Sequence, residues 1–134
     1  MNRIKDKIDE IEKYLFELED IVPDKIKDYK NDNVIRAACE RYFEKIVESV
    51  TDLSFIIILT KKLNIPQDDI NAFSILKENE IIDDNLYNKL KQAKGMRNIL
   101  AHQYGVVDDN VVFQALKNEL DGDILAFLKV VKRL

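Results

Sequence analysis

The helical spacing of apolar residues is the feature of this sequence that most constrains its fold. Between residues 4 and 22, apolar side chains step by four, three, four, three and four positions, which places them on one stripe of a helix. This stripe consists of Ile4, Ile8, Ile11, Leu15, Leu18 and Val22. Only 3 Gly and 2 Pro occur in 134 residues, far fewer than the turns of a many-stranded sandwich or barrel require. The chain is therefore predicted to be all-α.

A second periodic run begins at about Asn33 and reaches Leu63 without a Gly or Pro. It predicts a helix of ~45 Å, at ~1.5 Å per residue. Within it, residues 55–59 are apolar on every side, so they are expected to be buried against more than one neighbour. A β-strand is the competing interpretation of these five residues. Pro23 leaves a second alternative open, because the first helix can either kink and continue there or stop.

Three further helices are predicted from acidic starts and later breaks. A short one covers roughly 68–79, a fourth begins at Asp83 and Asp84 and ends near Gly105, and a fifth begins after Asp108. We expect a single domain, residues 1–134, folded as an up-and-down antiparallel bundle of four to five helices. The residues of the last helix predicted to face inward are Val112, Leu116, Leu120, Ile124, Phe127, Val131 and Leu134.

Charge and composition limit the chemistry. The formal net charge is −4, so any role with nucleic acid requires a local basic patch. The single cysteine, Cys39, and the single histidine, His102, cannot build a disulfide or a His/Cys zinc site, so neither a metal nor a cofactor is expected. The charged N-terminus lacks the apolar core of a signal peptide, and the longest apolar stretch is far short of the ~20 residues that cross a bilayer. We expect a soluble cytoplasmic protein without a membrane partner.

One charge interrupts the apolar stripe of the fourth predicted helix. With Leu86 set at 0° and ~100° per residue, Arg97 falls near ~20°, in the middle of the stripe. Burying a guanidinium without a partner costs several kcal/mol, so Arg97 needs an anion or an interface cleft. A structural explanation is an ion pair with an acid of a neighbouring helix, for which Glu40, Glu44 and Glu48 are candidates.

His102 falls near ~160° on the same wheel, so it does not share a face with Arg97. Either the helix end unwinds, or the Arg97 side chain reaches round the helix, or two copies of the chain bring both residues into one groove, which we favour. A histidine near a helix C-terminus is also a common cap for the last carbonyls. The segment before it carries a local run of basic residues in an acidic chain, which predicts an RNA-binding patch. The patch lysines are Lys89, Lys91 and Lys94.

The segment from Arg97 to Tyr104 has the form Arg, four residues, His, one residue, Tyr. It resembles the R-x4-H-x-Y signature of HEPN-domain proteins of the HepT/DUF86 type. The context agrees, because the motif ends the fourth helix of an all-helical chain and is preceded by Gly95-Met96. The entry into the long second helix, Ile35 to Arg41, is also similar to that family. The resemblance thus covers nearly the whole chain.

The resemblance implies a metal-independent endoribonuclease, the toxin of a type VII-like toxin–antitoxin module whose antitoxin is a minimal nucleotidyltransferase (MNT). It implies a homodimer that cuts RNA in a cleft between its two motifs. Arg97 then holds the phosphate, and His102 transfers protons near neutral pH, since an ordinary histidine has a pKa of ~6.5. Asn98 supports either of them, and Tyr104 lines the cleft and is the tyrosine to which the antitoxin attaches AMP.

Two other classes stay open on the sequence alone. The chain can be a catalytically silent HEPN-type module that binds a nucleotide or a protein in the same cleft. It can also be a structural bundle in which Arg97 is salt-bridged and His102 is a helix cap.

Overall fold

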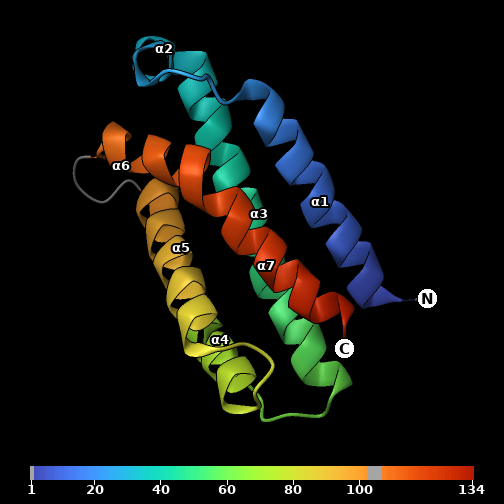
Figure 1. The fold of residues 1–134 in the computed structure, drawn as a ribbon. Coiled ribbons are helices and arrows are strands. Elements are labelled where there is room, and N and C mark those ends of the chain that lie inside the picture. The colour runs from blue at the N-terminus through green and yellow to red at the C-terminus, as the bar shows by residue number, and fades with distance from the viewer. Residues whose placement is uncertain (1, 103–106) are drawn as a thin grey trace.

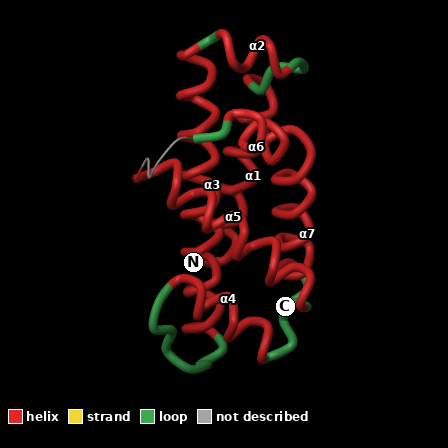
Figure 2. Tube along the Cα trace, turned by 90° about the vertical axis from the view of Figure 1, so that its left-hand side faces the viewer, coloured by secondary structure: helices red, strands yellow, loops and turns green. Residues whose placement is uncertain are grey.

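The computed structural model describes residues 2–102 and 107–134, and within them every regular element is helical (Figures 1 and 2). The elements are α1 (Arg3–Ile21), α2 (Ile26–Asn31), α3 (Asn33–Thr60), α4 (Asp69–Glu78), α5 (Asp84–His102), α6 (Asp109–Gln114), the π-helical segment η1 (Ala115–Glu119) and α7 (Leu120–Lys132).

The long helices α1, α3, α5 and α7 alternate in direction along the bundle, while the short helices α2 and α4 lie near its opposite ends (Figure 1). Helix α3 packs against α1, α2, α4 and α5, and α5 also contacts α4 and α7. This arrangement confirms the predicted all-α, up-and-down antiparallel fold. It also places the C-terminal half of α5, which contains Arg97, beside the middle of α3.

Burial follows the predicted apolar stripe closely in α1. In α1, Ile8, Ile11, Leu15 and Leu18 are all buried, because the 3–4 spacing turns them to the same side of the helix. Residues 55–59 belong to α3, so the β-strand alternative is wrong. Three of the five are buried against several neighbours, but Leu59 in the last turn is exposed.

The chain stops rather than kinks at Pro23. Helix α1 ends at Ile21, and the one-and-a-half turns of α2 separate it from α3. Helix α3 then begins under a side-chain cap, because the Asp32 carboxylate accepts the backbone N–H groups of Val34 and Ile35 at 3.0 Å each. The capping acid restores hydrogen bonds that the first turn of a helix cannot make internally.

Two helices end at a left-handed residue other than glycine, and one of these ends differs from the prediction. Helix α3 ends at Thr60, before the predicted Leu63, and Lys62 follows with a φ of 56°. Its N–H bonds to the Leu59 carbonyl at 3.2 Å, and the Leu63 N–H bonds to the Ile58 carbonyl at 2.9 Å. This pair of bonds is a Schellman motif, and Leu63 packs on the core beyond it. Helix α4 ends in the same way, with Glu80 at a φ of 60°.

The last predicted helix is present but contains a wider π turn at 115–119. Its predicted inward residues are buried from Val112 to Val131, across α6, η1 and α7. Leu134 is the exception: it lies beyond the end of α7 and is exposed, so that part of the prediction is wrong. The predicted helix end near Gly105 falls outside the described residues.

Candidate functional site

Arg97 lies on the side of α5 that packs against α3, as its position in the apolar stripe predicts. Its Nη2 donates to the Glu48 carboxylate, with 2.6 Å between Nη2 and Oε1. The Arg97 side chain is 20% exposed. The structure therefore provides the ion pair that a partly buried guanidinium requires, and selects Glu48 from the three acids considered as partners.

The other nitrogens of Arg97 are only partly used. Nη1 lies 3.3 Å from the Asn98 Oδ1, which is a long hydrogen bond. The buried Nε has no hydrogen-bond partner among residues 2–102 and 107–134. An unsatisfied buried donor costs about 1–3 kcal/mol. Arg97 is thus a cation with fewer acceptors than its five N–H groups can serve.

His102 is the last residue of α5 and is exposed. Because Arg97 faces α3, the two residues of the motif leave α5 in different directions, as the helical wheel predicts. Asn98 is half-buried and lies one turn before His102. The fourth candidate, Tyr104, lies outside the described residues.

The three lysines of the predicted patch do not form one surface. The Lys94 side chain is almost buried, and its ammonium pairs with Asp69 of α4 at 2.7 Å. The Lys89 ammonium pairs with Asp123 of α7 at 3.2 Å. Lys91 is exposed. The steps of two and three residues between them turn the side chain by ~200° and ~300° around the helix, so these lysines reach three different surroundings.

Arg41, which the sequence pattern did not single out as a site residue, also lies at this site. Arg41 of α3 places Nη1 4.0 Å from the same Glu48 oxygen that accepts from Arg97. The signal available in the sequence was the seven-residue spacing of Arg41 and Glu48, which puts them on one face of a helix two turns apart. That signal is weak, since charged pairs at such spacings are common on solvent-facing helices.

Other chemistry finds little support in the described part of the chain. Cys39 is fully buried, and burial raises the pKa of its thiol to about 11, so it is not a reactive nucleophile. Residues 2–102 and 107–134 hold no group of three His, Cys, Asp or Glu side chains arranged to bind a metal. Among the helices of these residues, none combines the length and apolarity needed to cross a membrane.

The fold matches solved toxin–antitoxin structures over at least 98% of the chain. The structure of a tri-AMPylated Shewanella oneidensis HEPN toxin in complex with its MNT antitoxin superposes with a TM-score of 0.93 and 26% sequence identity, covering all of both chains. A toxin–antitoxin structure determined with AMP-PNP has a TM-score of 0.90 at 24% identity, which shows the shared fold. The helical bundle and its match to the Shewanella oneidensis HEPN toxin thus define a protein of the HEPN class.

Within that class, the chain belongs to the HepT-like family, whose model, described as ribonuclease HepT-like, matches residues 5–131. The mRNA nuclease HepT of Shewanella oneidensis is 27% identical over 104 residues, which are 78% of this chain and 77% of the relative. The tRNA nuclease HepT of Aphanizomenon flos-aquae is 26% identical over 113 residues, 84% of this chain and 77% of the relative. The family that the resemblance predicted is confirmed, and it is a family of ribonucleases.

Proposed function

We propose that this chain is a metal-independent endoribonuclease toxin that cuts RNA in a cleft between two copies of the chain. The observation that carries the proposal is Arg97, a partly buried cation whose hydrogen-bonding capacity exceeds its partners, five residues before an exposed histidine. A guanidinium held at a helix contact with unused donors suits a ligand with several acceptor oxygens, such as a phosphodiester. Membership in the HepT-like family supports the same assignment.

The chemistry needs only proton transfer and charge stabilisation, because RNA supplies its own nucleophile. The 2′-oxygen attacks the adjacent phosphorus as His102 takes the 2′-hydroxyl proton, and the bond from phosphorus to the 5′-oxygen breaks. The leaving 5′-oxygen receives a proton from solvent water, which yields a 2′,3′-cyclic phosphate and a 5′-hydroxyl, and His102 then returns its proton to the solvent. Arg97 stabilises the negative charge that grows on the phosphate oxygens. Asn98, next to Arg97 and one turn before His102, orients either group.

The homodimer is proposed because one copy sends Arg97 and His102 in different directions. A two-fold axis through the exposed face of α5 sets the His102 of one copy near the motif of the other, and brings two copies of Lys91 to the same cleft. Light scattering is expected to give twice the single-chain mass at micromolar concentration. A monomer at that concentration contradicts the shared cleft.

We propose an MNT antitoxin as the partner and Tyr104 as the residue that it modifies with AMP. The support is the Shewanella oneidensis HEPN toxin, which was solved tri-AMPylated in complex with its MNT antitoxin. An AMP group beside Arg97 would bring a phosphate to the cation and exclude RNA by bulk. Intact-mass measurement after incubation with the partner enzyme and ATP is expected to show added AMP, and Tyr104→Phe is expected to abolish that gain.

The central test is cleavage of a mixed-sequence RNA by the purified chain in EDTA. We expect products that end in a 2′,3′-cyclic phosphate, at a rate that EDTA does not change. His102→Ala should lower the rate by about 10²–10⁴ if the histidine transfers protons. Equal cutting by His102→Ala and the parent protein would show that His102 is a helix cap and that the mechanism is wrong.

A second candidate function is a silent HEPN-type module that binds a nucleotide or a protein without cutting RNA. The observation that favours it is the Arg97–Glu48 ion pair, which already neutralises much of the cation. For such a module, RNA or nucleotide binds in the same assay and no product forms over many hours.

A further inference from the structure

Three charged groups from two helices meet at one carboxylate oxygen. The Glu48 Oε1 lies 2.6 Å from the Arg97 Nη2 and 4.0 Å from the Arg41 Nη1. Two guanidinium groups and one carboxylate leave the contacting groups with a net charge of +1. Without Arg41, the remaining ion pair would be neutral as a whole and would exert little attraction on a phosphodiester.

The two arginines differ in how they are held. The Arg97 side chain is 20% exposed and its contact with Glu48 is short, so it is the inner cation. The Arg41 side chain is 61% exposed and its contact is at the outer limit of an ion pair, so it is the outer cation. Such a loose surface pair contributes little energy, about 0–1 kcal/mol, and Arg41 can turn toward a new anion without a large loss.

We propose that Arg41 is a further RNA-binding residue of this site, which contacts a backbone phosphate next to the one that Arg97 holds, and that Glu48 between them positions Arg97. The proposal rests on the proposed ribonuclease function. Arg41 supplies the net positive charge that the Arg97–Glu48 pair lacks, and the single carboxylate keeps the two like charges apart. Glu48 acts through Arg97 and is a positioning residue.

The test of Arg41 measures binding of a 2′-O-methyl oligoribonucleotide, which cannot be cut because its nucleophile is blocked. Fluorescence anisotropy at several salt concentrations gives both the affinity and its salt slope. Loss of one phosphate contact is expected to reduce the slope by about 0.7, and Arg41→Ala to weaken binding at low salt by about tenfold. Arg41→Lys keeps the charge and should restore most of the slope.

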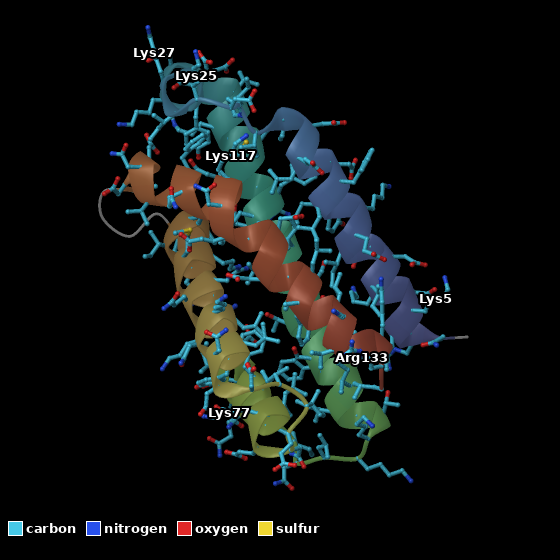
Figure 3. The ribbon with its side chains drawn as sticks, in the orientation of Figure 1. Lys5, Lys25, Lys27, Lys77, Lys117 and Arg133 are labelled. Atoms are coloured by element: carbon cyan, nitrogen blue, oxygen red, sulfur yellow. The ribbon has the colours of Figure 1, made fainter. Side chains whose placement is uncertain are left out.

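Arg133→Ala is the matched control. Arg133 is an exposed arginine just after α7, beside the C-terminus (Figure 3). It lies far from the end of the bundle where α2 leads into α3, the helix that carries Arg41 near its start. Its removal changes the net charge by the same amount as Arg41→Ala but should leave the affinity and slope nearly unchanged. If Arg41→Ala and Arg133→Ala behave alike, Arg41 is an ordinary surface cation and the proposal is overturned.

The positioning role of Glu48 is tested by Glu48→Gln, which keeps the shape and removes the negative charge. Because Arg97 then loses its counter-ion but keeps its charge, we expect KM for RNA to stay the same or fall while kcat falls by about tenfold or more. A purely structural role would leave kcat per folded molecule unchanged, and that result overturns the positioning role of Glu48.

If the parent protein neither binds nor cuts RNA, the proposed function itself fails. If the parent protein binds and cuts RNA but Arg41→Ala changes neither the affinity nor the salt slope, only the proposed role of Arg41 fails.

Discussion

Two cations on α5, three residues apart, show how neighbouring helices give similar residues different uses. Lys94 faces α4, where its side chain is 11% exposed and its ammonium lies 2.7 Å from the Asp69 carboxylate. Arg97 faces α3 and pairs with Glu48 at 2.6 Å. By distance alone the two ion pairs are equivalent.

The difference lies in the groups around each pair. Lys94 is the more deeply covered cation and joins α5 to the short helix α4, so its pair acts as a tie between two elements of the bundle. Arg97 has a second guanidinium nearby, a weak contact with Asn98 and a buried Nε without a partner in the described residues. The comparison indicates that a partly buried cation is a candidate for ligand binding when one of its buried nitrogens has no partner, as for the Arg97 Nε, and a structural tie when its buried nitrogen is paired, as for the Lys94 Nζ.

The two cations are expected to differ most in their effect on the rate of RNA cleavage. Arg97→Ala is expected to lower the cleavage rate by about 10²–10³, because it removes the group that stabilises charge on the phosphate. Lys94→Ala is expected to keep the rate per folded molecule within a few-fold of the parent. Initial rates at saturating RNA, corrected for the folded fraction by circular dichroism, check both. An equal loss in the two variants would remove the distinction.

For the free energy of unfolding the order should be reversed, with a larger loss for Lys94→Ala than for Arg97→Ala. Lys94→Ala leaves the Asp69 carboxylate without its cation, and we expect the free energy of unfolding to fall by about 2 kcal/mol. This is less than for a fully buried pair, because Asp69 is 40% exposed. Arg97→Ala also removes an unsatisfied Nε, so its cost should be smaller, about 1 kcal/mol. Urea unfolding measures both, and Lys91→Ala on the exposed side of the same helix is the control, with a change below about 0.5 kcal/mol.

A cluster of hydrogen bonds around Glu10 of α1, one of them from Ser49 of α3, extends the comparison to the pH dependence of stability. The hydrogen bond from Lys7 at 2.7 Å, helped by those from Ser49 and Tyr14, lowers the pKa of Glu10 below its usual 4.5. Because the folded pKa lies below the unfolded one, this contribution to stability is present above about pH 4.5 and is lost as the pH falls through the folded pKa.

Glu10→Gln should therefore flatten part of the loss of stability in acid, by less than about 1 kcal/mol because the carboxylate is partly exposed. Urea midpoints between pH 3 and pH 6 give the measurement. A parent and a variant that lose stability in parallel over this range would show that other carboxylates dominate the acid transition.

Local patterns were sufficient for most of the fold. The 3–4 spacing in α1 predicted its buried face, and the acids Asp32, Asp68 and Asp108 cap the helices that follow them. They were insufficient at the end of α3, which comes three residues before the predicted Leu63, whereas α4 ends close to its predicted residue 79. At Lys62 and Glu80 the backbone takes a left-handed φ, and packing of Leu63 and Ile81 on the core offsets its cost.

For the candidate site, too, some features follow from the sequence and others only from the tertiary structure. The sequence by itself determined that Arg97 sits on the apolar stripe and that His102 points elsewhere, since both follow from the 100° turn per residue. Only the tertiary structure decided that Glu48 is the partner of Arg97, that Arg41 shares its oxygen, and that Lys94 is enclosed by α4 rather than part of a basic patch. These contacts join residues that are far apart in the chain, and the helical period carries no information about which helix stands opposite a given face.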